Sequence, residues 1–226
     1  MRLDLFPDAV CTATGPVEAP APLHPDEEAL AREMGDARRR EFAAGRDCAR
    51  RALRTLGAAD GPVLRGPRRA PRWPAGVVGA ITHTRGFCAA AVAREADCAG
   101  VGLDAERWRP LSERALARIC HEEEVTRLRA LPRHPAELWG AAVFSAKETL
   151  YKAYFPLTAT FIGFRDAQVR LLPESDDAGR FETWLVRDDV PDAAGRRCFE
   201  GRYSIGTAGE EALVITGLAM PPATGS

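Results

Sequence analysis

The order of helical and β-like patterns constrains the fold of this chain more than any other feature of its sequence. A helical pattern over residues 36–56 precedes a β-like hairpin at 77–95 and a further β-like run at 98–106. A second helical region and a second set of β-like runs follow, and the hairpin segments GAITHTRGFCAAAVA and GRYSIGTAGEEALVITGLA are comparable. We therefore predict an α+β fold in which one helix-and-sheet unit occurs twice.

Local signals set the ends of these elements. Pro25 and the three acids after it predict a short helix, because proline suits the first helical position and acids suit the first turn. The longer helix should begin near Asp36 and stop at Gly57. Two more helical stretches are expected over residues 111–131 and 136–155. The later strands are predicted at residues 161–172, 181–188, 201–207 and 211–220.

Length and charge narrow the classes of function. A chain of 226 residues suits one large domain or two of about a hundred residues each. The net charge of −1 gives no general attraction to nucleic acid or to a membrane surface. The start, MRLDLFPDAV, lacks the apolar core of a signal peptide, and no run is long enough to span a membrane. The six cysteines are scattered without a CxxC pair, so we expect a cytoplasmic protein without disulfides or zinc.

The two lysines are the most unusual feature of the charge pattern. Of 31 cationic residues only Lys147 and Lys152 are lysine, and both lie in FSAKETLYKAYF next to Glu148. Glu148 shares a helix face with Phe144 and Tyr151, where a carboxylate is unexpected unless something pairs with it. A plain i, i+4 ion pair between Glu148 and Lys152 is the alternative, and it does not account for Lys147.

A pair of acids follows a buried-looking strand in VGLDAE. Because side chains alternate along a strand, Asp104 and Glu106 leave the same face. Two carboxylates held side by side favour a cation between them, and Mg²⁺ takes one or two carboxylates together with water and phosphate oxygens. The alternative is a solvated strand end with two ordinary surface acids.

Groups that bind phosphate are also present. His83 ends a β-like run in ITHTRG, although a lone histidine is often structural. Arginines come from the long helix and from the loop before Trp73, and guanidinium forks match phosphate oxygens, although helix arginines are usually solvated. These are Arg38, Arg39, Arg40, Arg46, Arg65, Arg68, Arg69 and Arg72. Acids, lysines, histidine and arginines together indicate a site for a magnesium-bound phosphoanhydride with an additional phosphate.

The order of these motifs resembles a known enzyme family. VGLDAE, followed about forty residues later by FSAKETLYK, resembles the paired signature of Sfp-type 4′-phosphopantetheinyl transferases, (V/I)G(V/I)DxE and (W/F)xxKE(A/S/T)xxK. The segments REFAAGRDCARRAL, RWPAGVVGAITHT and KAYFPLT are similar to the enterobactin-synthase branch, which includes actinobacterial carrier-protein-activating enzymes. The match runs in order from about Arg38 to Phe164.

This resemblance implies a fold, a reaction and partners. The fold would be a pseudo-dimer of two similar α+β subdomains, residues 1–103 and 104–226, with the active site in the cleft between them. The enzyme would transfer 4′-phosphopantetheine from coenzyme A to a serine of an apo carrier protein and release adenosine 3′,5′-bisphosphate. Mg²⁺, or Mn²⁺ in its place, would be required. The carriers would belong to polyketide, nonribosomal peptide, siderophore or fatty-acid synthases.

The resemblance also implies roles for the acids and lysines. Asp104 and Glu106 would hold Mg²⁺, and Glu148 would be its third ligand or the base for the serine hydroxyl. Lys147 and Lys152 would contact the phosphates, and Lys152 would stabilise the charge of the leaving group. The catalytic set is therefore Glu148, Lys152 and Asp104.

The remaining implied contacts hold coenzyme A. His83, beside Thr82, would bind a phosphate oxygen, and arginines from the helix and the loop would hold the adenosine 3′-phosphate. The full cofactor-binding set is Arg38, Arg46, Arg65, Arg68, Thr82, His83, Lys147 and Lys152.

Two other functions fit parts of the pattern. A magnesium-dependent hydrolase of phosphoanhydrides would turn over without a carrier protein. A non-enzymatic, arginine-rich module would bind nucleic acid with an affinity that falls steeply with salt. We expect neither nucleic acid nor a membrane as a partner, and we expect a monomer, because an internal pseudo-dimer needs no partner subunit.

Overall fold

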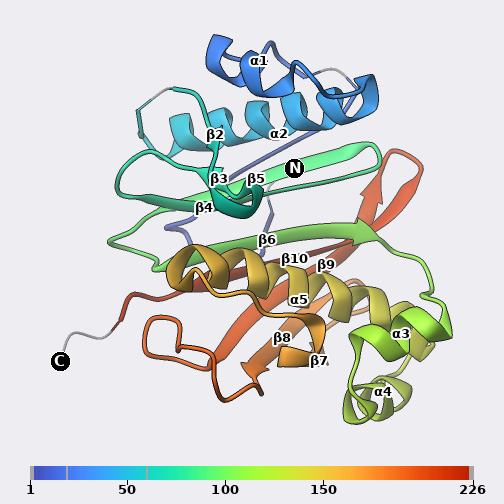
Figure 1. The fold of residues 1–226 in the computed structure, drawn as a ribbon. Helices are drawn as coiled ribbons and strands as arrows, with labels where there is room; N and C mark the ends of the chain where they lie inside the picture. Colours follow the sequence, from blue (N-terminus) through green and yellow to red (C-terminus); the bar gives the residue numbers. More distant parts are fainter. Residues whose placement is uncertain (1–2, 19, 60, 224–226) are drawn as a thin grey trace.

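The computed structural model describes residues 3–18, 20–59 and 61–223 (Figure 1). The elements of the N-terminal half are β1 (Cys11–Gly15), α1 (Pro25–Ala31), α2 (Asp36–Thr55), β2 (Leu64–Arg65), β3 (Pro71–Arg72), β4 (Val77–Thr84) and β5 (Phe87–Arg94). The antiparallel strands β1, β5 and β4 form a sheet in that order, and α2 packs on it. A short 3-10 turn, Pro67–Arg69, lies between β2 and β3, which pair with each other.

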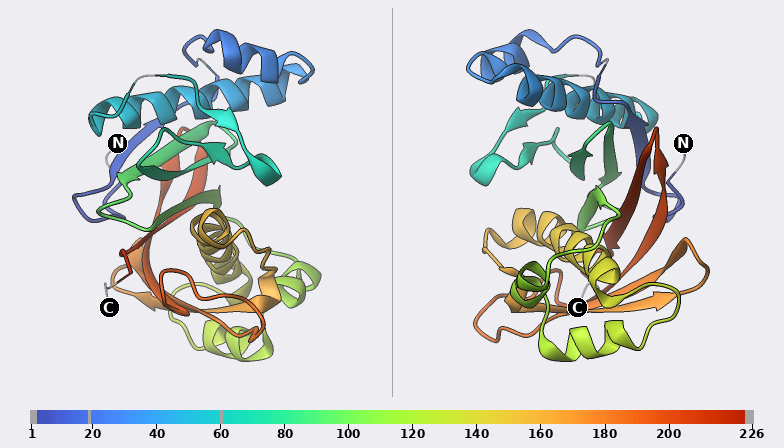
Figure 2. Two further views of the ribbon diagram at one scale, coloured as in Figure 1. Left: turned by 60° about the vertical axis from the view of Figure 1, so that its left-hand side comes forward. Right: turned by 90° about the vertical axis from the view of Figure 1, so that its right-hand side faces the viewer.

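The C-terminal half repeats this plan on a larger scale. Its elements are β6 (Gly100–Arg107), α3 (Glu113–Ile119), α4 (Glu122–Arg129), α5 (Ala136–Thr158), β7 (Ala167–Pro173), β8 (Ala178–Leu185), β9 (Cys198–Ala208) and β10 (Glu211–Met220). The sheet order is β6-β10-β9-β8-β7, and α5 packs on it. Figure 2 shows the two halves one above the other. The predicted α+β fold with two subdomains is confirmed.

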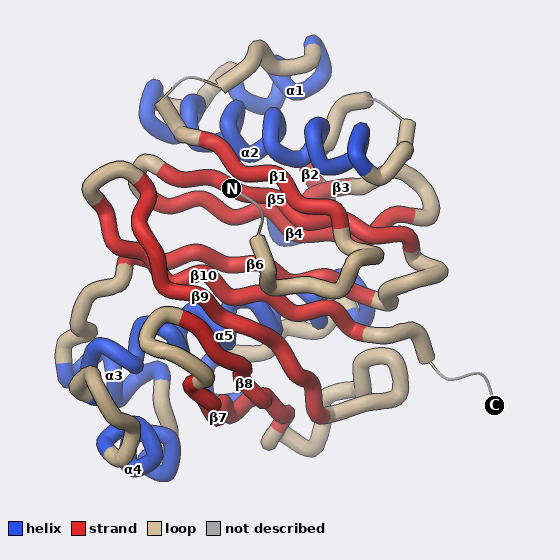
Figure 3. Tube along the Cα trace, turned by 180° about the vertical axis from the view of Figure 1, so that it is seen from behind, coloured by secondary structure: helices blue, strands red, loops and turns tan. Residues whose placement is uncertain are grey.

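The two sheets meet where β6 lies beside β4. From behind, the strands of both sheets follow one another across the molecule, with α5 on the far side (Figure 3). Leu103 and Ala105 of β6 belong to one buried cluster with Ala89 and Ala91 of β5 and Leu213 of β10. This shared apolar core holds the two halves in one arrangement, because opening them would expose it to water.

A close approach of α5 to β6 sets the position of the acids. A Cβ atom on Gly102 would lie 2.1 Å from the carbonyl oxygen of Thr149. Only glycine lets the α5 backbone come this near the strand. Asp104 follows two residues later on the same face of β6, so it is directed at α5.

A buried glutamate ties α1 to the N-terminal half. The Glu27 side chain is fully buried and forms an ion pair with Arg50 of α2. Its Oε1 accepts a hydrogen bond from the Val63 backbone N–H at 2.9 Å, and its Oε2 accepts one from the His24 N–H at 3.0 Å. Every contact neutralises or satisfies the carboxylate, which is what a buried acid requires.

Most predicted elements are confirmed, and three differ. The strand over residues 77–84 and the helix start at Asp36 are as predicted. The stretch 111–131 forms two helices rather than one, because Cys120 is extended and His121 caps a new helix. Residues 161–172 begin with the 3-10 turn Phe164–Asp166 before β7 starts. The edge strand β1 was not predicted at all.

Three further findings concern the expectations about domains, disulfides and membrane spans. The predicted boundary between residues 103 and 104 falls inside β6, which is one strand of the five-stranded sheet. The division of the chain into subdomains at this point remains a prediction. All six cysteines are free thiols. Within the described part of the chain, no helix combines the length and apolarity needed to cross a membrane.

Candidate active site

A cavity of about 250 Å³ lies between the two halves. Helix α2, the turn between β2 and β3, and β4 line it on one side, and α5 lines it on the other. Most of the predicted site residues meet there. They are Arg38, Arg46, Arg68, His83, Glu148 and Lys152.

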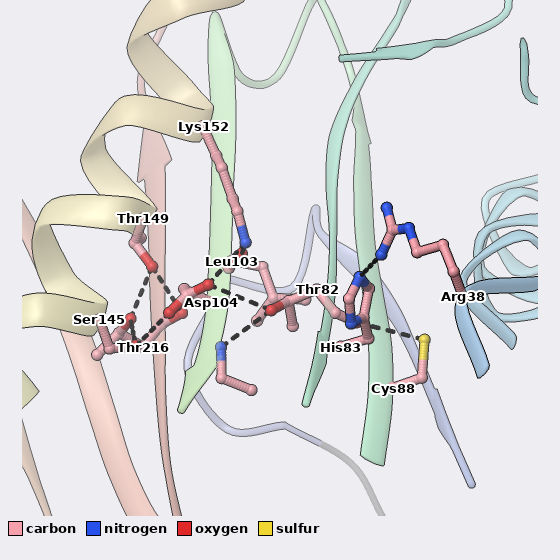
Figure 4. A network of polar contacts seen from close by, with 11 residues as sticks. Arg38, Thr82, His83, Cys88, Leu103, Asp104, Ser145, Thr149, Lys152 and Thr216 are labelled. Atoms are coloured by element: carbon pink, nitrogen blue, oxygen red, sulfur yellow. Dashed lines mark hydrogen bonds and ion pairs between the residues drawn. The ribbon is translucent and has the colours of Figure 1, made fainter. Parts of the chain in front are cut away.

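Asp104 does not line this cavity itself, but its carboxylate binds Lys152, which does, and it accepts three side-chain hydrogen bonds (Figure 4). Its Oδ1 accepts from Lys152 Nζ at 2.7 Å and from Thr82 Oγ1 at 3.2 Å. Its Oδ2 accepts from Ser145 Oγ at 2.9 Å. Lys152 therefore forms its ion pair with Asp104 of the VGLDAE segment. The alternative, an i, i+4 ion pair between Glu148 and Lys152, is wrong. Charge-assisted bonds of this kind hold a carboxylate firmly in one orientation.

A group of hydroxyls behind Asp104 was not found by sequence reasoning. Ser145 Oγ lies 2.8 Å from Thr216 Oγ1, which lies 2.6 Å from Thr149 Oγ1 (Figure 4). All three side chains are buried. Thr216 is the register partner of Asp104 across β6 and β10, a pairing between residues too distant in sequence for local patterns to indicate. These hydroxyls stabilise the buried side of the acid site.

Thr82 supports Asp104 rather than facing the cavity. It is buried, donates to Asp104 and accepts from the Ala105 backbone N–H at 3.1 Å. Its hydroxyl is thus used within the protein, and the structure does not direct it at the phosphate that it was predicted to contact.

Neighbouring carboxylates shift the pKa values of Glu106 and Glu148, of which only Glu148 lines the cavity. Burial, Asp104 and Glu148 together raise the pKa of Glu106 to about 7, against the opposing effect of Lys152. Burial and Asp104 raise the pKa of Glu148. Mutual repulsion of this kind is relieved by a cation, and carboxylate oxygens are the donors that Mg²⁺ prefers. Among the described residues no three acids, histidines or cysteines lie close enough together to hold a metal ion by themselves. A magnesium ion bound by these carboxylates would therefore need water and phosphate oxygens as its other ligands.

The raised pKa of Glu106 predicts a pH dependence of stability in metal-free protein. Its folded pKa of about 7 lies above the ordinary value of 4.5, so folding favours the protonated form. The contribution of Glu106 to stability is therefore present below about pH 4.5 and is lost as the pH rises through 7. In EDTA at pH 8, we expect Glu106→Gln to melt roughly 2–4 °C higher than wild type. Melting curves from pH 4.5 to 8 test this, and a difference that grows toward low pH would contradict it.

Arg46 is the most deeply buried cation that faces the cavity. It is 6% exposed, and its Nε is buried without a hydrogen-bond partner among the described residues. Burial, followed by the neighbouring arginines, lowers its pKa to about 10, although Glu27 opposes this. Arg46 and Arg65 both lie over the Phe42 ring, at 4.4 and 5.0 Å from its centroid. A buried guanidinium with an unused donor is ready to bind an anion.

Two other predicted phosphate ligands have different surroundings. Arg38 NH1 lies 2.7 Å from His83 Nε2 (Figure 4). Arg68 has its guanidinium over the rings of Phe161 at 5.2 Å and Phe155 at 6.0 Å. Both arginines line the cavity, and Arg65 lies next to it.

Lys147 is the exception among the predicted ligands. Its side chain is 2% exposed, and its Nζ donates to Glu124 Oε2, the Ile119 carbonyl and the Phe164 carbonyl, each at 2.8 Å. Three acceptors use all three protons of the ammonium. Glu124 also accepts from the Val169 N–H, so it repeats in the C-terminal half what Glu27 does in the N-terminal half. The predicted phosphate contact of Lys147 is therefore corrected: this lysine is part of the subdomain core.

Comparisons with known proteins agree with this geometry. Residues 26–93 match the model of the 4′-phosphopantetheinyl transferase N-terminal domain, and residues 100–206 match that of the 4′-phosphopantetheinyl transferase superfamily. The 4′-phosphopantetheinyl transferase Svp of Streptomyces mobaraensis is 42% identical over 207 residues, which cover 90% of this chain and 81% of Svp. The chain belongs to this superfamily.

Two more relatives place the phosphopantetheinyl transferase within the Sfp-type branch. PptT of Mycobacterium tuberculosis is 37% identical over 204 residues, covering 88% of this chain and 86% of PptT. Enterobactin synthase component D of Salmonella typhimurium is 34% identical over 144 residues, covering 62% of this chain and 58% of that protein. The protein is thus an enzyme that transfers phosphopantetheine to carrier proteins, and the hydrolase and nucleic-acid alternatives are set aside.

Proposed function

We propose that the cavity between the halves binds coenzyme A, and that the enzyme moves its phosphopantetheine group to a carrier-protein serine and releases adenosine 3′,5′-bisphosphate. The buried guanidinium of Arg46 carries this proposal, because Arg46 lines the cavity and its Nε has no hydrogen-bond partner among the described residues. A dianionic phosphate monoester is the natural partner of such a group. Arg65 and Arg38 would share that phosphate, and Arg68 would cover it.

The pyrophosphate would lie between His83 and Lys152. Both line the cavity, on opposite walls. Lys152 is anchored by Asp104 and by the Leu103 carbonyl at 3.1 Å, so its charge is fixed in place. A fixed cation stabilises the charge that develops on the leaving phosphate without any reorganisation during the reaction.

Mg²⁺, for which Mn²⁺ could substitute, would be held by Asp104, Glu106 and Glu148. Such an ion would supply positive charge to offset that of the pyrophosphate. Glu148 would alternatively accept the proton of the attacking serine hydroxyl, and its raised pKa makes its carboxylate a stronger base than an ordinary glutamate. A positioned base of this kind contributes roughly 10²–10⁴-fold.

The acceptors would be carrier domains of polyketide, nonribosomal peptide, siderophore or fatty-acid synthases. The similarity to an enterobactin synthase component supports carriers of siderophore and other secondary metabolism. We also propose a monomer that acts in the cytoplasm, without nucleic acid or membrane partners, since the two halves already form the cavity between them.

The role of Arg46 gives the test of the proposed ligand. Arg46→Ala should raise the Kd for coenzyme A by roughly 10–100-fold, the effect of losing a charge-assisted hydrogen-bond pair. It should also reduce the preference of the wild type for coenzyme A over 3′-dephospho-coenzyme A in titration calorimetry, while Arg65 and Arg38 retain part of it. Arg39→Ala is the control, because Arg39 is on the same helix, exposed and paired with Glu28. An unchanged preference in Arg46→Ala would refute the assignment.

A further inference from the structure

An acid lines the cationic wall of the cavity. Glu41 of α2 is about one-third exposed and faces the same space as four arginines. These are Arg38, Arg46, Arg68 and Arg69. A carboxylate in a site for a polyanion repels the ligand by Coulomb's law, so an idle Glu41 would only weaken binding. Its contacts show what it can contribute.

Glu41 contacts two of the groups proposed to bind phosphate. Its Oε2 lies 3.0 Å from Arg38 NH1 and 3.8 Å from His83 Nδ1. Arg38 NH1 also lies 2.7 Å from His83 Nε2. Because a guanidinium can only donate, Nε2 accepts this bond, and the proton of the neutral ring is on Nδ1, on the side of Glu41.

This arrangement changes when Arg38 binds a phosphate. As long as His83 Nε2 accepts from Arg38, it cannot donate to a phosphate oxygen. A guanidinium that turns to a phosphate releases both Nε2 and the Glu41 carboxylate. The Nδ1–H of His83, whose nitrogen lies 3.8 Å from Glu41 Oε2, is then available to donate to that carboxylate. A histidine whose Nδ1–H is held by a carboxylate can take a proton on Nε2 and donate it to the phosphate.

The charges around His83 are consistent with this exchange. Burial is the main reason that its pKa is below the ordinary value, and Arg38 from α2 and Lys152 from α5 act in the same direction. Glu41 from α2 and Asp104 from β6 oppose them. When Arg38 moves its charge to a ligand, one of the groups that oppose protonation of His83 is removed, and the two carboxylates then favour the doubly protonated ring against burial and Lys152 alone.

We propose that Glu41 is a positioning residue for coenzyme A: it pairs with Arg38 as observed, and it orients His83 toward a ligand phosphate once Arg38 has turned to that ligand. The proposal rests on the proposed function, since it takes coenzyme A as the ligand of the cavity.

The direction in which Glu41→Ala changes the affinity for coenzyme A tests this proposal. Simple repulsion predicts that Glu41→Ala tightens the binding of a polyanion, whereas positioning through His83 predicts that it weakens binding. We expect the Kd for coenzyme A to rise about 10-fold, with kcat changed less than about 3-fold, and Glu41→Asp to recover most of the affinity. In a His83→Ala background, Glu41→Ala should no longer weaken binding.

A matched control isolates the position of the charge. Asp47 is on the same helix, paired with Arg51 and outside the cavity lining, so Asp47→Ala removes one charge without touching His83. It should leave the Kd unchanged. Tighter or unchanged binding in Glu41→Ala, or equal weakening with and without His83, would overturn the proposal. If wild type itself shows no coenzyme A binding, the proposed function fails rather than the role of Glu41.

Discussion

Replacing Asp104 with asparagine should reduce phosphopantetheine transfer by about a thousandfold or more. The amide has nearly the same shape, but it is neutral, so it can neither anchor the Lys152 ammonium nor contribute charge to a metal ion. Loss of one preorganised charge at a reacting phosphate typically costs roughly 10²–10³-fold, and here two such contributions are lost together. Single-turnover transfer to an apo carrier protein measures the effect, and the cooperative melting transition should remain.

Ser145→Ala is the matched control for Asp104→Asn. It removes one donor to the same carboxylate, the 2.9 Å bond to Oδ2, but leaves the charge and the Lys152 contact in place. We expect a loss of transfer of about 10-fold or less. Equal losses in the two variants would mean that the geometry of the hydroxyl group, and not the carboxylate charge, controls the rate.

Lys147→Met should instead destabilise the protein and leave coenzyme A affinity unchanged. The substitution leaves the fully buried Glu124 without its cation, and removing one partner of a buried pair costs about 3–5 kcal/mol. For a chain of this size the melting temperature should fall by roughly 10 °C. Glu124→Gln in the same background should restore part of the loss, because it removes the uncompensated charge.

Replacing Lys152 should have the opposite effects on activity and stability. Lys152 is 27% exposed and reaches the cavity, so Lys152→Met should abolish transfer with a smaller loss of stability. If Lys147→Met weakened coenzyme A binding without lowering the melting temperature, the assignment of the two lysines would be reversed. Calorimetry and melting curves on the pair therefore separate the structural lysine from the catalytic one.

The two lysines show which features of the site local sequence patterns can predict. Local periodicity predicted that Asp104 and Glu106 share one face of a strand and that Glu148 and Lys152 lie on a helix. In the structure this strand, β6, and this helix, α5, pack against each other. Neighbouring positions on a helix point to different sides, however. Whether Lys147 faces the cavity or the core depends on how α5 packs on its sheet.

Other features were beyond local patterns because they need contacts between distant segments. Thr216 meets the acid site through the register of β6 and β10, and Glu41 meets His83 only where α2 crosses β4. The repeated buried acids, Glu27 and Glu124, each bind a backbone N–H from beyond their own helix. None of these pairings leaves a periodic signal in the sequence.

Intact-protein mass spectrometry of a carrier protein shows whether this enzyme transfers phosphopantetheine from coenzyme A and whether the transfer needs magnesium. An apo carrier protein is incubated with the enzyme, coenzyme A and Mg²⁺, alongside a sample with excess EDTA and one with Asp104→Asn. We predict a mass gain of one phosphopantetheinyl group in the complete reaction, with little or none in the other two. An unmodified carrier across several carrier classes, or an equal gain in EDTA, would contradict the proposed mechanism.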